Sequence, residues 1–210
     1  MRILVLADVE SKSLWDYFNP EYVKDVDLIL AAGDLKASYL EFLVTLCNLP
    51  LVYVPGNHDK AYLVNPPEGC INADGKVIDI HGLRIAGLGG CYCYNKGPYQ
   101  YTERQMFLRT LKLRVSILLH HGADILLTHA PAYNLGDAED LAHIGFKSFV
   151  RLLDRFSPCL MVHGHVHMNY GMKIKREIQY KNTRIVNAYE KYIIEIDDEA
   201  LKTHKKNGKR

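Results

Sequence analysis

The chain has 210 residues and a mass of 24.0 kDa, with 48% hydrophobic and 24% charged residues. This balance is typical of a globular domain and excludes a disordered chain. The formal net charge of +2 does not by itself indicate a nucleic-acid or membrane-surface protein, and no apolar run is long enough to span a membrane. We expect one domain over residues 1–210, with a basic, frayed tail from about residue 200 to 210.

The first third of the chain alternates between apolar runs and a helical segment. Apolar runs at residues 3–7, 28–32 and 51–54 stop abruptly at polar residues, and they lack the alternation of a half-exposed strand. Such runs are typical of strands that are buried on both faces. Between the second and third runs, a Ser-x-x-Glu capping box predicts a helix over residues 38–46.

The middle of the chain departs once from this rhythm. Residues 77–87 have the pattern of an antiparallel hairpin, with His81 and Gly82 at its turn. A second capping box, Thr102-x-x-Gln105, begins a longer predicted helix. In this helix four apolar side chains share one face, namely those of Phe107, Leu111, Val115 and Leu118.

The last part contains two more apolar runs, at residues 125–127 and 160–162, separated by a predicted helix over residues 146–156. Three strand-like runs then follow one another without a helix between them, at residues 178–180, 184–188 and 192–196. Strands that alternate with helices predict an α/β fold with much parallel pairing. The hairpin and the final runs add an antiparallel part.

Several predicted strands end at a side chain that can bind a metal ion. Ligands collect at the carboxyl ends of strands in α/β sheets, because the loops there converge on one point. The side chains in this place are Asp8, Asp34, Asn57, His58, His129, His165 and His167. All of them are oxygen or imidazole donors, which suit Mn²⁺, Fe or Zn²⁺. A single such residue is more often structural, but a donor at several strand ends is not expected by chance.

This order of motifs resembles the calcineurin-like metallophosphoesterase superfamily. The resemblance extends from about Arg2 to His167, and Gly-Asn-His-Asp at residues 56–59 together with Gly-His-x-His at residues 164–167 are its most specific parts. It implies a four-layer α-β-β-α sandwich of two mixed sheets flanked by helices. It also implies two divalent metal ions, of which we favour Mn²⁺, with Fe, Zn²⁺ or Mg²⁺ as alternatives.

The resemblance assigns a role to each matching residue. Asp34 would bridge the two ions; Asp8 and His167 would complete the first site, and Asn57, His129 and His165 the second. A hydroxide held between the ions would attack phosphorus in line. His58 would contact the phosphate and protonate the leaving oxygen, with Asp59 orienting its ring. The alternative for Asp59 is a loop carboxylate that binds free backbone amides.

Glu10 departs from the family pattern, since it stands where a metal-binding histidine is expected in an Asp-x-His motif. We favour the interpretation in which its carboxylate is itself a metal ligand, as oxygen donors suit Mn²⁺ or Mg²⁺. It could instead hold a metal-bound water, or the first site could bind metal weakly. The departure affects the metal and the rate, and leaves the fold prediction unchanged.

Two loops are candidates for substrate recognition. Residues 89–99 are rich in glycine and tyrosine, so Tyr92 or Tyr94 could stack on a ring and Lys96 could contact phosphate; equally, the tyrosines could pack against the following helix. The acidic residues between 136 and 143 suit a helix start, with a cleft-lining role as the alternative. Five cysteines without a disulfide framework predict a reduced, cytoplasmic protein.

We therefore predict a metal-dependent hydrolase of phosphomonoesters or phosphodiesters. Its partner would be a phosphate-ester substrate, with nucleic acid involved only as a substrate and no membrane partner. The sequence does not fix the oligomeric state. The alternative is a catalytically weak metal-binding scaffold of the same fold. His58 argues against a scaffold, which needs no proton donor for a leaving group, whereas Glu10 argues for one.

Overall fold

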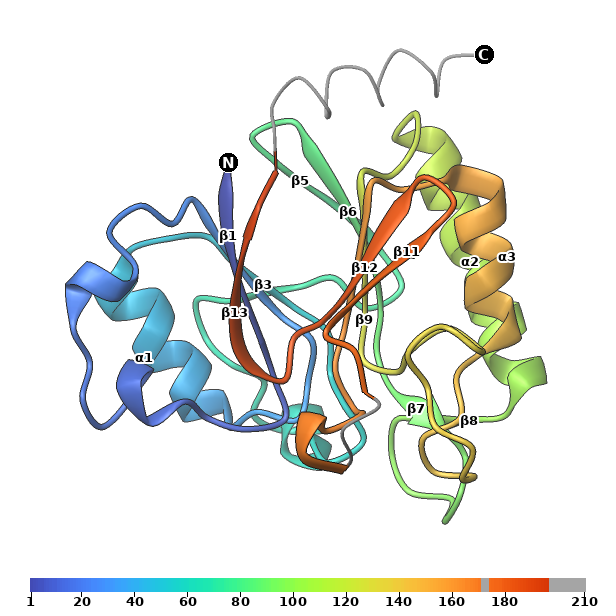
Figure 1. The fold of residues 1–210 in the computed structure, drawn as a ribbon, viewed down its shortest axis with the longest axis horizontal. Coiled ribbons are helices and arrows are strands. Elements are labelled where there is room, and N and C mark those ends of the chain that lie inside the picture. The colour runs from blue at the N-terminus through green and yellow to red at the C-terminus, as the bar shows by residue number, and fades with distance from the viewer. Residues whose placement is uncertain (171–173, 197–210) are drawn as a thin grey trace.

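The computed structural model describes residues 1–170 and 174–196, so the predicted basic tail lies outside the described residues. Its first sheet has the strand order β13-β1-β2-β3-β4. The strands are β1 (Arg2–Ala7), β2 (Leu28–Ala31), β3 (Leu51–Tyr53), β4 (Ile71–Asn72) and β13 (Glu190–Glu195). Strands β1 to β4 pair in parallel, and β13 joins the edge of β1 in the antiparallel sense. The carboxyl ends of β1, β2 and β3 therefore lie along one edge (Figure 1).

The second sheet has the order β11-β12-β10-β9-β6-β5. Its strands are β5 (Val77–Ile80), β6 (Leu83–Leu88), β9 (Ile125–Thr128), β10 (Leu160–His163), β11 (Glu177–Tyr180) and β12 (Thr183–Asn187). The four central strands are parallel, whereas β5 and β11 pair with their neighbours as antiparallel hairpins. A small third sheet joins β7 (Cys91–Tyr92) to β8 (Gln100–Tyr101).

Helices cover the outer faces of the two large sheets (Figure 1). Helix α1 (Ala37–Cys47) lies on the first sheet, and α2 (Glu103–Leu119) with α3 (Lys147–Phe156) lies on the second. Short 3₁₀ segments lie in the loops: η1 (Lys12–Leu14), η2 (Pro20–Tyr22), η3 (Lys60–Leu63) and η4 (Met168–Tyr170). Among the described residues, no helix combines the length and apolarity needed to cross a membrane.

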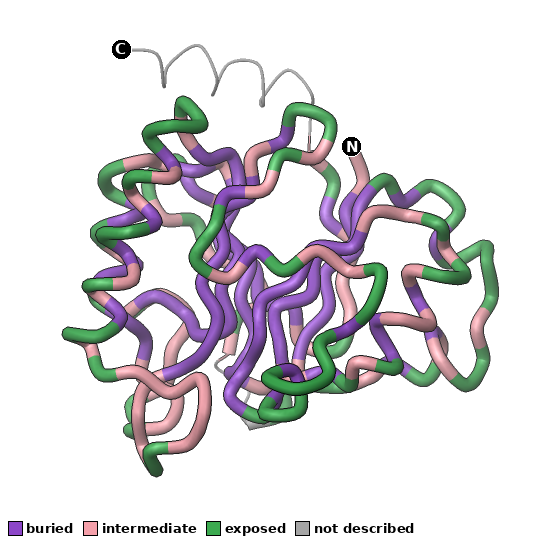
Figure 2. The backbone as a smooth tube through the Cα atoms, turned by 180° about the vertical axis from the view of Figure 1, so that it is seen from behind, coloured by how far each residue is buried: buried purple, intermediate pink, exposed green. Residues whose placement is uncertain are grey.

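Three apolar clusters separate the layers of the molecule. Successive residues of a strand point to opposite faces, so Ile3 and Val5 of β1 pack between the sheets, whereas Leu4 and Leu6 pack against α1. The other sheet behaves alike, with Ile125 facing the first sheet. The buried backbone gathers in these strands at the centre (Figure 2). The order helix, sheet, sheet, helix is the predicted four-layer α-β-β-α sandwich, and the continuous apolar runs are explained by burial on both faces.

One of the two predicted capping boxes is wrong. Helix α1 begins after Lys36, so Ser38 lies inside it and caps nothing; the Glu41 carboxylate instead accepts a hydrogen bond from the Glu68 amide. In α2 the Thr102–Gln105 capping box is confirmed.

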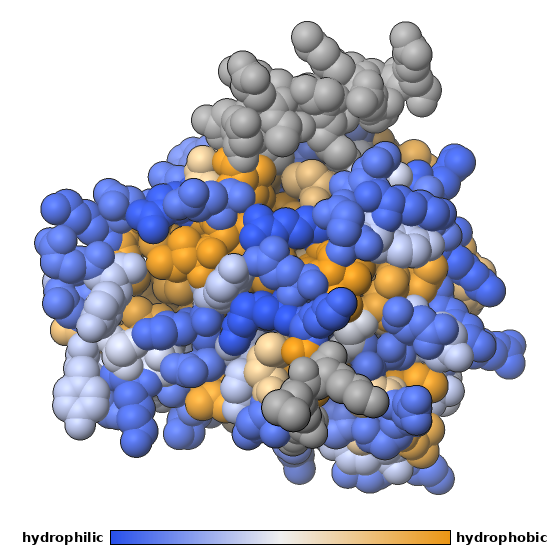
Figure 3. Space-filling model, viewed as in Figure 1, coloured by the Kyte–Doolittle hydropathy of each residue, from blue (hydrophilic) through white to orange (hydrophobic). Residues whose placement is uncertain are grey.

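The apolar face predicted for α2 is not the face that packs. Leu111, Val115 and Leu118 are exposed, because the second sheet contacts the other side of the helix, where Met106, Thr110, Leu113 and Ile117 are buried. Hydrophilic residues nevertheless predominate on the face of the molecule seen in Figure 3, and hydrophobic residues show between them in separate patches.

Candidate metal centre

The predicted ligands come together where the carboxyl ends of both sheets meet. Asp8, Asp34 and Asn57 follow β1, β2 and β3 of the first sheet, whereas His129, His165 and His167 follow β9 and β10 of the second. Asp8, Asp34, Asn57, His58, His165 and His167 line one pocket of about 350 Å³, together with Tyr94, Ala142 and His143. The parallel pairing in each sheet produces this convergence.

Three of these residues adopt a backbone conformation that side chains rarely tolerate. Asp8 has a φ of 67°, Asp34 of 56° and His165 of 69°, all in the left-handed region. Non-glycine residues in this region are uncommon and concentrate at functional sites. Each residue directly follows a strand or lies in the adjacent turn, so the unusual φ turns its side chain across the sheet edge.

Two glycines allow the loops to approach one another closely. A Cβ atom on Gly56 would overlap the carboxylate of Asp34. One on Gly164 would lie 2.5 Å from Ala7 Cβ and 2.9 Å from Asp8 Oδ2. Any side chain at either position would displace a carboxylate of the cluster, which gives a physical reason for glycine in both motifs.

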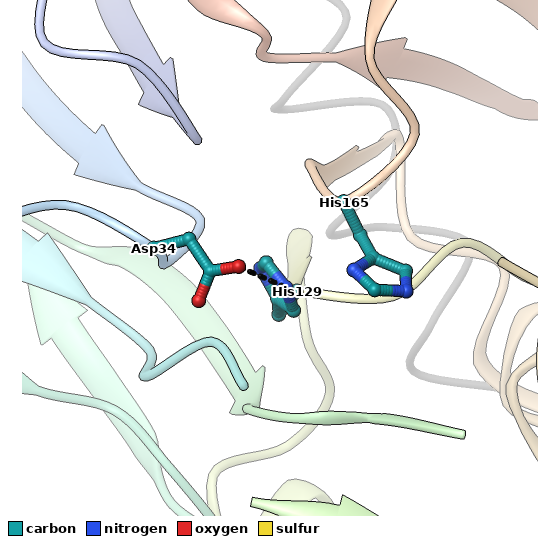
Figure 4. Close-up of side chains that lie close together, drawn as sticks. All are labelled: Asp34, His129 and His165. Carbon is teal, nitrogen blue, oxygen red and sulfur yellow. Dashed lines mark ion pairs between the residues drawn. The ribbon is translucent and has the colours of Figure 1, made fainter. Parts of the chain in front are cut away.

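His129 lies at the centre of the cluster and is fully buried. Its Nδ1 atom lies 2.7 Å from the carbonyl oxygen of Ala32, to which it donates a hydrogen bond. Its Nε2 atom lies 3.0 Å from Asn57 Oδ1. It also lies 3.3 Å from Asp34 Oδ2, the ion pair marked in Figure 4. The Ala32 carbonyl thus fixes the tautomer in which Nε2 faces the two oxygen donors.

His165 is held in the same manner by a different carbonyl. Its Nε2 atom lies 2.7 Å from the carbonyl oxygen of Ala142, and its ring centre lies 4.8 Å from that of His129. The His165 amide donates to both carboxylate oxygens of Asp8, at 2.9 and 3.0 Å. With Nε2 bound to a carbonyl, Nδ1 is the atom of His165 that remains for a ligand.

Burial and opposite charge shape the electrostatics of the cluster. Burial alone would raise the pKa of Asp34, but His129 and the amide and ring of His58 outweigh it and lower this pKa to about 2. Burial alone would lower the pKa of His129, yet Asp34 dominates and raises it to about 9. Burial raises the pKa of Asp8 to about 7. In the protein without metal, a proton on His129 Nε2 is therefore donated to the oxygen atoms of Asn57 and Asp34 that surround it.

The donor set fits a divalent cation. One ligand atom each from Asp34, His129 and His165 lie within 4.8 Å of one another. Carboxylate, carboxamide and imidazole donors are the ligands of Mn²⁺, Fe and Zn²⁺, and histidine ligands characteristically donate their second N–H to a carbonyl or carboxylate. A cation would also offset the burial that raises the pKa of Asp8, because it favours the charged carboxylate.

The two predicted catalytic residues lie beside the cluster. His58 donates its backbone amide to Asp34 Oδ1 at 2.7 Å, and its ring Nε2 lies 4.0 Å from Asp34 Oδ2. Asp59 Oδ2 accepts hydrogen bonds from the amides of Asp34, at 2.8 Å, and Gly56, at 2.7 Å. Asp59 is 5% exposed. The structure therefore shows Asp59 in the amide-binding role, and the orientation of His58 by Asp59 stays a prediction.

Glu10 and His167 occupy the margins. The ring Nε2 of His167 lies 4.0 Å from Asp8 Oδ1. Glu10 Oε1 accepts a hydrogen bond from the Lys36 amide at 3.1 Å and lies 3.8 Å from Lys36 Nζ. Glu10 lines a neighbouring pocket of about 520 Å³, which shares only Asp34 and His58 with the pocket described above. The structure thus places the Glu10 carboxylate beside Lys36, and its role as a metal ligand stays a prediction.

The tyrosine-rich loop contributes one residue to the pocket. Tyr94 lines it and accepts a hydrogen bond from Asn57 Nδ2 at 3.2 Å. Tyr92 instead packs against Phe146, with ring centres 5.6 Å apart, and Lys96 is an exposed loop residue. Neither Tyr92 nor Lys96 is among the described residues that line the metal pocket.

The acidic loop does not start a helix, which corrects the favoured interpretation. Helix α3 begins at Lys147, and the side chain of Glu103 in α2 accepts its first amides. Residues 137–145 instead form turns that place Ala142 and His143 on the pocket wall. Asp140 Oδ1 lies 2.8 Å from His143 Nδ1.

The sequence analysis did not predict that the backbone carbonyls of Ala32 and Ala142 hold the two histidine rings. Every residue has a backbone carbonyl, so the sequence does not indicate which carbonyl binds which ring.

Comparisons with known proteins bear on the family of the chain and on its fold. Residues 1–169 match the family model described as calcineurin-like phosphoesterase. The chain is 24% identical to a Haemophilus influenzae protein described as uncharacterized, over 93% of this chain and 99% of that one.

Two solved structures share the fold. The structure of TT1561 from Thermus thermophilus aligns with a TM-score of 0.63 at 19% identity, covering 90% of this chain and 89% of that one. A hypothetical protein from the same organism aligns with a TM-score of 0.51 at 15% identity, covering 89% of this chain and 75% of that one.

Proposed function

The chain belongs to the calcineurin-like phosphoesterase family, and from this premise we propose that it hydrolyses phosphomonoesters or phosphodiesters with two divalent metal ions. One observation carries the proposal. The rings of His129 and His165 each have one nitrogen bound to a backbone carbonyl, while an oxygen-rich cluster lies beside the other nitrogen of His129. Such anchoring sets the direction of an imidazole lone pair and is characteristic of metal ligands.

The residues divide into two ligand groups around a shared carboxylate. Asp8 and His167 would hold one ion and Asn57, His129 and His165 the other, with Asp34 common to both. We favour Mn²⁺, because the set mixes oxygen and nitrogen donors without sulfur. The ions would lower the pKa of a bound water and neutralise charge on the phosphate. Asp59 maintains this arrangement by holding the amides of Asp34 and Gly56.

In this proposal His58 would donate a proton to the leaving oxygen. Its side chain is 75% exposed, and its ring lies at the junction of the two pockets, whose linings both include it. General acid catalysis requires a proton donor within hydrogen-bond reach of the leaving group. With phosphate in the metal pocket, the leaving group would extend past His58 into the second pocket.

The lining of the second pocket suits a polar leaving group. It includes the side chains of Glu10, Lys36, Ser38, Glu41 and Asn65. In this scheme Glu10 would also contact the leaving group, while its role as a metal ligand stays a prediction. Both pockets are open to solvent at the exposed His58, so we favour a small phosphoester, or a nucleic-acid end as substrate.

Hydrolysis of p-nitrophenyl phosphate and bis-p-nitrophenyl phosphate tests the proposal. Metal-stripped protein receives Mn²⁺, Mg²⁺, Fe²⁺, Zn²⁺ or no metal, beside the variants His58→Ala and Asp34→Asn. Metal-dependent turnover that falls at least a hundredfold in both variants is expected, since one removes the proton donor and the other a charge of the cluster. Folded, metal-binding protein without turnover on either ester would contradict an enzyme and favour the scaffold.

A further inference from the structure

The loop between β7 and β8 carries one side chain to the metal pocket. Tyr94 lines that pocket, whereas Tyr92 of the same segment packs against Phe146. The side chain of Gln100 fixes the loop, because its Oε1 atom accepts hydrogen bonds from the amides of Tyr94, at 3.2 Å, and Asn95, at 3.1 Å. The position of Tyr94 over the pocket is therefore determined by backbone contacts as well as by its own side chain.

Tyr94 forms a hydrogen bond with Asn57, whose side-chain carboxamide can face the metal pocket in two orientations. Asn57 is 6% exposed, so its polar atoms require partners within the protein. Its Oδ1 atom lies 3.0 Å from His129 Nε2, and its Nδ2 atom donates to Tyr94 Oη at 3.2 Å. The two ends of a carboxamide differ in chemistry, since only the oxygen can bind a cation.

We propose that Tyr94 is a positioning residue, whose hydroxyl holds the Asn57 carboxamide with its oxygen directed to the metal centre. The hydroxyl gives Nδ2 an acceptor, so in this orientation the buried amide nitrogen has a hydrogen-bond partner. Without the hydroxyl, Nδ2 loses that acceptor and the carboxamide can rotate its nitrogen toward the ion. The role rests on the proposed metal centre and differs from stacking against a substrate ring.

Manganese binding by the whole chain tests this role without relying on turnover. Isothermal titration of chelator-treated protein with MnCl₂ compares wild type with Tyr94→Phe, which keeps the ring and removes only the hydroxyl. Removal of a residue that orients a ligand typically weakens metal affinity about 10–100-fold, so we expect at least a tenfold loss. Tyr92→Phe is the matched control from the same segment and is expected to bind as wild type does.

Each result separates the possible roles. Tenfold weaker binding in Tyr94→Phe, with an unchanged melting temperature of the metal-free protein, supports positioning. Binding within twofold of wild type overturns it, and a raised KM at unchanged metal affinity assigns Tyr94 to the substrate instead. Equal weakening in Tyr92→Phe, or a lowered melting temperature in Tyr94→Phe, indicates a structural effect and also overturns it. A wild type that binds no Mn²⁺ contradicts the metal centre itself.

Discussion

Replacement of Asp59 distinguishes the two roles considered for this carboxylate. Asp59→Ala removes the acceptor of the Asp34 and Gly56 amides, whereas Asp59→Asn keeps an oxygen in the same place and removes only the charge. Since both variants remove the charge, the difference between them isolates the hydrogen bonds to the two amides. Leaving a buried amide without its acceptor costs about 1–3 kcal/mol, so Asp59→Ala should be less stable than Asp59→Asn by about 2–6 kcal/mol.

The negative charge of Asp59 affects the stability of the fold in the opposite direction to its hydrogen bonds. Burial, and then the nearby Asp34 charge, raise the pKa of Asp59 from 3.8 to about 6, so its ionised form destabilises the metal-free fold. The shift corresponds to roughly 3 kcal/mol, because one pKa unit is about 1.4 kcal/mol. Asp59→Asn resembles the protonated acid and should exceed wild type in stability by up to this amount. The difference should be absent below pH 4 and should appear as the pH rises to about 6.

Urea unfolding followed by circular dichroism, in the presence of chelator and at several pH values, measures both differences. Asp59→Ala within 1 kcal/mol of Asp59→Asn would refute the bracing of the two amides by Asp59. Hydrolysis with metal restored provides the second comparison. Bracing predicts that Asp59→Asn keeps most of the activity, whereas orientation of the His58 ring by the negative charge predicts a loss of tenfold or more.

Three further predictions concern the surroundings of the site. Arg84→Met should destabilise the fold by about 3–5 kcal/mol in urea unfolding, because it removes the guanidinium that contacts the fully buried Asp124 at 2.6 Å. An unchanged free energy of unfolding would contradict a coupled buried pair. Gly164→Ala should lower metal-free stability by about 1–3 kcal/mol, since its Cβ would lie 2.9 Å from Asp8 Oδ2; crystal structures with an unmoved Asp8 would contradict this. Burial lowers the pKa of His163 to about 4. Wild type should therefore lose on the order of 3 kcal/mol relative to His163→Gln as the pH falls from 6.5 to 4, and parallel pH profiles would refute this.

Strand positions and ligand order were predictable because both depend on local sequence. A strand buried on both faces must be apolar throughout, so runs such as residues 28–32 can be recognised in the sequence, and each candidate ligand lies within four residues of a strand end. The Thr102 capping box is equally local. By contrast, the packed face of α2 depends on which side meets the second sheet, and the leucine or valine side chains at residues 108, 111, 115, 118 and 119 of this helix remain exposed.

The candidate site shows the same difference between features that depend on local sequence and features that depend on distant residues. The motifs indicated the candidate ligands but not the partners that orient them. Asp59 follows His58 directly in sequence, yet its oxygen binds the amide of Asp34, 25 residues away. The carbonyl of Ala142 meets His165 across a separation of 23 residues. Such contacts form when loops distant in the sequence pack together in the fold. The sequence of neither loop indicates its partner.

The hydrogen bonds at the candidate metal centre also join the two sheets to each other. His129 of the second sheet donates to the carbonyl of Ala32 in the first, and the His165 amide donates to Asp8 across the same boundary. The apolar contacts between the sheets are non-directional and permit small sliding movements, whereas hydrogen bonds do not. The polar end of the interface therefore determines the angle at which the sheets dock. A volume change at Leu30 or Ile125, deep between the sheets, would therefore strain these hydrogen bonds and reach the candidate site through them.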